Sequence, residues 1–282
     1  ALTGIAGVTN DSLKSVTVTG LDEVKDHDAI YGAIEQTDDT SALNINGVSL
    51  TLTGTGNLVS YTDTKVNPKV TKLSDITFTD DNSELVTTGE GAQIGKVGND
   101  VAKGSLYVKS GDLTANGDVT VKSLEVESGA KLSIADNKDG NGYAVTTGDE
   151  KALISGELAA ANSDVTFGST ATATYDTDGA VSSFGNVNKV TGKLAAKTLM
   201  LAGDMLVNQG GTVEAGKLDA NGKTVFVGDS ASAGSLSVGE LTAGSIYADP
   251  TWKEDGSAAA VSLVACLLYT SPSPRDYAAS RM

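Results

Sequence analysis

The sequence Ser-Leu-Tyr-Val-Lys-Ser-Gly at residues 105–111 returns as Ser-Leu-Glu-Val-Glu-Ser-Gly at residues 123–129, and this pair decides the fold. Each copy alternates apolar and polar residues, as a half-buried β-strand does, and then reaches Ser-Gly, which favours a turn. A repeat of about 18–20 residues that holds two or three short strands is typical of one rung of a parallel β-helix. We therefore predict an all-β fold, a right-handed parallel β-helix (β-solenoid).

Other segments repeat in the same style. Leu-Thr-Ala-Asn-Gly at 113–117 returns as Leu-Asp-Ala-Asn-Gly at 218–222, and Ser-Asp-Ile-Thr-Phe at 74–78 returns as Ser-Asp-Val-Thr-Phe at 163–167. Ser-Leu-Ser-Val at 235–238 restates the first motif. In such a fold the inward side chains of one rung stack on those of the next rung.

The alternation also predicts which side chains form the core. Leu124, Val126 and Leu132 should point into a narrow apolar column, whereas Glu125 and Glu127 should point outward. A narrow column has little room for large rings, which agrees with the aromatic content of only 5%.

The repeats divide the chain into three parts. Residues 1–100 are expected to form an irregular β-solenoid with acidic loops, such as 22–28 and 80–84. Residues 101–255 should form the regular β-solenoid, and residues 256–282 a disordered tail.

The end of this tail resembles translated sequencing reagents. Residues 266–276 (Cys-Leu-Leu-Tyr-Thr-Ser-Pro-Ser-Pro-Arg-Asp) resemble the conceptual translation of a sequencing-library adapter, and 280–282 resemble the flow-cell sequence that follows it. Both arginines of the chain, Arg275 and Arg281, lie here. We expect 266–282 to be adapter-derived and the remainder to be an internal fragment of a longer reading frame; the alternative is a genuine Pro-rich tail.

The repeat pattern resembles a known family. Leu-x-Val-x-Ser-Gly-x-Leu at 106–113, its counterpart with one insertion at 124–132, and the segment 216–250 resemble the passenger region of Gram-negative type V autotransporter adhesins. The likeness covers most of 40–250. It implies an extracellular location on the bacterial cell surface. It also implies a membrane link only through a C-terminal barrel, of which this sequence shows none.

Charge and composition exclude several classes of protein. The net charge of −16 disfavours a nucleic-acid partner and an anionic membrane surface. A single cysteine excludes a disulfide framework and thiolate zinc sites. No apolar run reaches the ~18 residues of a transmembrane helix.

One loop offers a weak calcium site. Asn137, Asp139 and Asn141 supply oxygens at alternate positions before a glycine, as calcium loops do. However, Gly148 stands where such a loop needs a bidentate glutamate. Asp-Gly and Asn-Gly are also preferred turn residues, so a simple turn is the competing interpretation.

No catalytic residue and no cofactor are predicted. Gly228-Asp229-Ser230 is similar to a serine-nucleophile motif, but the only histidine, His27, lies far upstream and a general base is required. Both features are interpreted as surface turns or loops.

The function expected is an extracellular adhesin passenger fragment that mediates adhesion or self-association. Its partner would be a host or glycan surface ligand, or a second copy of the chain. The alternative is a stalk or surface-layer repeat protein that binds nothing. A glycan-active β-helix enzyme, whose paired carboxylates meet across rungs, is a further possibility.

Overall fold

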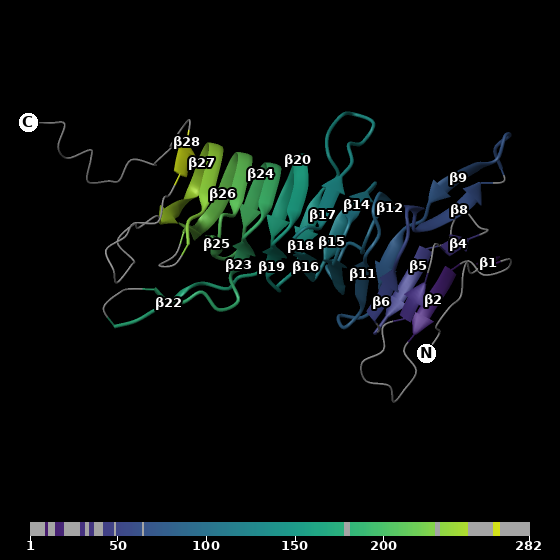
Figure 1. Cartoon of the computed structure of the whole chain (residues 1–282), viewed down its shortest axis with the longest axis horizontal. Coiled ribbons are helices and arrows are strands. Elements are labelled where there is room, and N and C mark those ends of the chain that lie inside the picture. The colour runs from purple at the N-terminus through teal and green to yellow at the C-terminus, as the bar shows by residue number, and fades with distance from the viewer. Residues whose placement is uncertain are drawn as a thin grey trace, which may run out of the picture.

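The computed structural model describes residues 9–10, 15–19, 29–31, 34–36, 42–47, 49–63, 65–177, 181–228, 232–247 and 262–265. This part of the chain is all-β, with 28 strands and no helix. Figure 1 shows most of the strands stacked along the long axis of the molecule, from β2 and β5 to β27 and β28. His27, Asp229, Ser230, the acidic segment 22–28 and the tail 266–282 lie outside the described residues.

Most strands belong to three stacks of parallel strands, which the chain visits in turn. The first stack contains β3 (Ala29–Tyr31), β6 (Ser49–Leu52), β11 (Glu84–Thr87), β13 (Ser105–Val108), β16 (Ser123–Val126), β19 (Ala152–Ile154), β23 (Asn188–Val190) and β25 (Met205–Val207).

The second and third stacks share four long strands, which turn a corner between them. These are β20 (Glu157–Phe167), β24 (Lys193–Leu201), β26 (Thr212–Val227) and β27 (Ser235–Tyr247). The second stack also contains β7 (Gly56–Asn57), β12 (Ala92–Ile94), β14 (Asp112–Ala115), β17 (Lys131–Ile134) and β28 (Ser262–Ala265). The third contains β2 (Ser15–Thr19), β5 (Ala42–Asn46), β10 (Ile76–Phe78), β15 (Val119–Val121) and β18 (Val145–Thr147). The ends of β26 and β27 return to the first stack.

The remaining strands form two small sheets beside the stacks. One has the order β1 (Thr9–Asn10), β4 (Ile34–Gln36), β8 (Val59–Asp63) and β9 (Val70–Leu73). The other is the antiparallel pair β21 (Thr174–Tyr175) and β22 (Val181–Ser183). The strand pairs β8–β9 and β21–β22 both lie in connections that lengthen a repeat.

Inward side chains stack in continuous apolar rows. In the third stack, successive paired residues are buried, with at most 7% of any side chain exposed: Leu43, Ile76, Val97, Val119, Val145, Val165, Leu199, Leu218 and Leu241. One cluster joins this row to the inward rows of the other two stacks. This arrangement of long parallel sheets around one core is compatible with a β-solenoid.

The predicted core residues are confirmed, but the predicted period of 18–20 residues holds only for some repeats, since Leu50 pairs with Leu85, 35 residues later, and Leu124 pairs with Ala152, 28 residues later. Ser105 pairs with Ser123, which follows it by 18 residues, and Met205 pairs with Val225. Leu124, Val126 and Leu132 are fully buried. Glu125 is only half-buried and Glu127 is exposed, so the predicted outward face is confirmed.

Two of the recurring segments lie in different stacks from the segments that they resemble. Leu113 belongs to the second stack but Leu218 to the third, so 113–117 and 218–222 do not lie over one another. Likewise Leu236 lies in the second stack, whereas Leu106 lies in the first. The reason is physical: all three stacks need the same inward alternation, so similar sequences occur on different faces.

The third recurring pair shares one row, and the acidic segment 80–84 is a short turn that leads into β11. Ile76 and Val165 occupy the same row of the third stack. Asp80 begins the turn that joins β10 directly to β11, in which Ser83 is buried. Glu84 is already the first residue of β11.

Glycine allows close approach at the corner between the first and second stacks. A Cβ atom on Gly192 would lie 1.9 Å from the carbonyl oxygen of Gly156, the corner residue of the preceding repeat. Only glycine fits where successive backbones meet this closely, which helps explain the 33 glycines of the chain.

Candidate functional site

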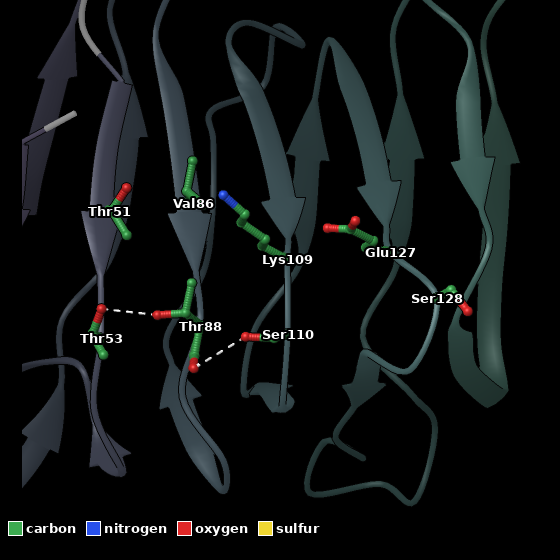
Figure 2. A pocket seen from close by; sticks show the side chains of 8 residues that line it. All are labelled: Thr51, Thr53, Val86, Thr88, Lys109, Ser110, Glu127 and Ser128. Carbon is green, nitrogen blue, oxygen red and sulfur yellow. Dashed lines mark hydrogen bonds between the residues drawn. The ribbon is translucent and has the colours of Figure 1, made fainter. Parts of the chain in front are cut away.

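A groove lies on the outer face of the first stack, across β6, β11, β13 and β16. It encloses about 440 Å³ and is lined mostly by short polar side chains: Thr51, Thr53, Val86, Thr88, Lys109, Ser110, Glu127 and Ser128. Figure 2 shows these side chains on consecutive parallel strands. Because the strands stack side by side, the groove runs across them, along the stacking direction.

The strand register places the groove residues in rows. Thr51 pairs with Val86, Val86 with Tyr107, and Tyr107 with Glu125, so these four outward side chains follow one another across the stack. Thr51 and Val86 are only 8% and 6% exposed, which makes them the floor of the groove.

A second outward row lies two residues further along the same strands. The backbone ladder continues past each strand end, since the amides of Thr88, Lys109 and Glu127 donate to carbonyls of the preceding repeat. The side chains of this row therefore keep the spacing of neighbouring strands, about 4.8 Å.

Hydroxyl groups in this row are connected. Thr53 Oγ1 and Thr88 Oγ1 lie 2.8 Å apart, within hydrogen-bond distance. Ser110 Oγ donates to the Thr88 carbonyl oxygen at 3.4 Å. Figure 2 shows both contacts. One edge of the groove is therefore a connected polar rim whose hydroxyls can both donate and accept hydrogen bonds.

A tyrosine orients the carboxylate at the end of the groove. Tyr107 Oη donates to Glu127 Oε2 at 2.5 Å, a charge-assisted hydrogen bond. This bond to Glu127 is the largest cause that raises the pKa of Tyr107 to about 12, and burial adds to it. Partial burial raises the pKa of Glu125, and the charges of Glu127 and Glu84 raise it further.

The calcium candidates lie in one turn, and the side-chain oxygens of Asn137 and Asn141 accept hydrogen bonds there. The Asn137 side-chain oxygen accepts the backbone amides of Asp139, at 2.9 Å, and of Asn141, at 3.2 Å. Asn141 Oδ1 accepts a hydrogen bond from Lys197 Nζ at 3.3 Å. Asp136 and Gly142 close the segment as an antiparallel bridge. These contacts form a polar turn, in which Asn137 acts as the turn-capping side chain.

The described residues include no candidate metal cluster and no candidate membrane-spanning helix. Among them, no three His, Cys, Asp or Glu side chains are arranged so that they could hold a metal ion. The same part of the chain includes no helix with the length and hydropathy needed to cross a bilayer.

An apolar patch on the outer face of the first stack was not predicted from the sequence. Leu206 and Phe226 point outward but are 3% and 1% exposed, because residues of the connection 168–187 pack over them. Phe184 meets Phe226 edge to face, with ring centroids 5.2 Å apart. A signal for this burial exists in the sequence: Met205-Leu206-Val207 and Val225-Phe226-Val227 are apolar without alternation, as in strands covered on both faces.

The groove itself was also missed. Its residues lie at outward positions of several segments, and its hollow shape depends on four strands together. No protein-family model, no curated protein and no solved structure matches the chain.

Proposed function

We propose that the chain is part of a right-handed parallel β-solenoid that acts as an extracellular binding rod on a bacterial surface, of the autotransporter-adhesin kind. The observation that carries this proposal is the polar groove across four stacked strands. A site of this form suits an extended ligand held by many small contacts along a repetitive surface.

The strand arrangement supports the solenoid part of the proposal. Successive repeats such as those of β13–β15 and β16–β18 contribute one strand to each of three parallel stacks, and repeats add length without adding new kinds of core contact. Such proteins present long continuous faces to partners. The proposed ligand is a glycan or a host surface molecule, with self-association of the chain as a further mode of binding.

Two other functions are alternatives to the binding rod. A stalk or surface-layer protein would have the same stacks and no ligand. A glycan-active enzyme is favoured by one observation, the adjacent outward carboxylates Glu125 and Glu127 beside the groove, the first with a raised pKa. A pair of carboxylates is what most glycoside hydrolases use.

The deciding experiment uses the purified full chain in three assays. It is tested for binding to a glycan array and to host cells, for turnover of the same glycans, and for concentration-dependent light scattering. Binding or self-association without turnover supports the binding rod. Inert, monomeric protein supports the stalk, and turnover lost in Glu125→Gln or Glu127→Gln supports the enzyme.

A further inference from the structure

We infer that the groove over β6, β11, β13 and β16 binds an uncharged, extended glycan chain laid across the strands, with successive sugar units over successive strands. This inference rests on the proposed binding function and assigns it a site and a ligand class. The spacing of the strands, the side chains that line the groove and the charge of this face support it.

The spacing of the groove suits a linear polysaccharide. Neighbouring strands repeat every 4.7–4.9 Å, which is close to the length of one pyranose unit in an extended glycan. Thr53 and Thr88 are equivalent side chains on consecutive repeats, and Lys109 and Glu127 continue their row. Each sugar would therefore meet a polar side chain at a similar position.

The lining combines the two kinds of contact that sugars need. Hydroxyls of Thr53, Thr88 and Ser110 both donate and accept, as sugar hydroxyls do. On the floor, the side chain of Val86 and the methyl group of Thr51 offer a small apolar surface for the C–H face of a sugar ring. The groove is therefore neither a purely apolar slot nor a charged patch.

Two charged side chains of the groove supply one hydrogen-bond donor and one acceptor at defined positions. Lys109 is an exposed donor, and Glu127 is an acceptor whose direction is set by the Tyr107 hydroxyl. Carboxylates held in place by a second hydrogen bond are strong acceptors for hydroxyl ligands, since less ordering is needed on binding.

Charge decides between neutral and acidic glycans. Glu84, Glu125 and Glu127 lie on this face; partial burial raises the pKa of Glu125, and the negative charges of Glu127 and Glu84 raise it further. The whole chain carries a net charge of −16. A polyanion would be repelled by this field, whereas a neutral chain would not be.

The test measures binding of the full chain to cellobiose, cellotetraose and cellohexaose by calorimetry, with tetragalacturonate as the acidic counterpart. Affinity should rise from the disaccharide to the tetrasaccharide and then level off, because the groove crosses four strands. Tetragalacturonate should bind more weakly than cellotetraose, increasingly so as salt is lowered.

Matched variants locate the site. Thr88→Val and Glu127→Gln should each weaken cellotetraose binding about tenfold, the factor expected for one lost hydrogen bond. Thr146→Val changes a similarly half-buried outward threonine of the third stack, and Glu214→Gln an exposed glutamate of the second. Both controls should bind like the parent, and circular dichroism should match for all four variants.

The outcomes separate this inference from the proposed function. Cellotetraose binding that is equal in groove and control variants would overturn the groove while leaving a binding rod. Binding to host cells without binding to any of the oligosaccharides would overturn the ligand class in the same way. If the chain binds neither oligosaccharides nor cells and does not self-associate, the groove and the binding rod both fail.

Discussion

At the scale of single residues, neighbouring positions of one strand have opposite requirements. Val126 is fully buried in the inward row of the first stack, whereas Glu125 faces outward beside Glu127. The same two-residue period holds in β13 and β17. The loss of stability caused by a substitution should therefore depend on whether the position faces inward or outward, more than on its distance from the chain ends.

The first prediction compares Val126→Asp with Glu125→Gln. The aspartate would place an unpaired carboxylate in the core, so the free energy of unfolding should fall by several kcal/mol, about 3–5. Glu125→Gln should change it by less than ~0.5 kcal/mol, and in the stabilising direction at neutral pH. The raised pKa of Glu125 means that folding disfavours its charged form. Urea unfolding of both variants is the measurement; equal losses would contradict the assigned faces.

The second prediction concerns Thr87, a polar residue in an apolar row. It pairs with Leu52 and Val108, is 1% exposed, and its hydroxyl finds no hydrogen-bond partner among the described residues. Thr87→Val keeps the shape and removes a buried polar atom, so it should stabilise the fold by about 1 kcal/mol. The control is Thr146→Val at an outward position, which should be close to neutral. A loss of stability in Thr87→Val would show that the hydroxyl is satisfied.

The third prediction uses alkaline pH. The pKa of Tyr107 rises from 10.0 to about 12 on folding, chiefly because its hydroxyl donates to Glu127. A raised pKa favours the protonated form in the folded state, so the stabilisation is complete below pH 10 and is lost as pH rises to about 12. Tyr107→Phe lacks this contribution. The difference in free energy of unfolding between parent and variant should therefore shrink over that pH window, and a constant difference would contradict it.

At the scale of elements, the connection 168–187 is held by two buried polar residues. Asp204 accepts the backbone amides of Ala173 at 2.8 Å and of Thr224 at 2.9 Å. Asn188 accepts the amide of Ala152 at 3.0 Å. These bonds satisfy backbone groups where an insertion interrupts the regular ladder, as buried donors require. They also position the connection over the apolar patch of Leu206 and Phe226.

The fourth prediction tests that anchor. Asp204→Ala leaves two buried amides without acceptors and should cost about 2–4 kcal/mol. It should also expose Leu206 and Phe226, which a dye that binds apolar surface would detect. Asp164→Ala, at an exposed position of the third stack, should cost less than ~0.5 kcal/mol. An Asp204→Ala variant as stable as Asp164→Ala would show that packing alone holds the connection.

At the scale of the whole molecule, the sequence predicts the period of some repeats but not the stack to which each segment belongs. The motif at 105–111 and 123–129 reveals the repeat because adjacent turns of the chain must match row by row. It cannot reveal the stack to which an isolated copy belongs, since Leu106 and Leu236 satisfy the same inward pattern on different faces. The groove and the covered patch depend on several strands or on an insertion, so one strand's pattern contains only part of their signal.

The last prediction follows from the same row-by-row pairing. Deleting residues 105–122 removes one whole repeat and joins Gly104 to Ser123. β16 would then pair with β11, β17 with β12, and Val145 with Val97, all in the register they now share through the deleted repeat. The shortened chain should therefore fold, with cooperative unfolding and a somewhat smaller urea m-value, because it buries less surface.

The matched control deletes only residues 105–113, half of that repeat. Thr114 would then follow Gly104, so the remainder of β14 would take the place of β13 beside β11, and the second stack would lack its strand in that repeat. This variant should lose several kcal/mol or fail to fold, although it removes half as many residues. Circular dichroism and urea unfolding compare the two deletions. If the half-repeat deletion proves the more stable of the two, the stacking of repeats row upon row does not hold this molecule together.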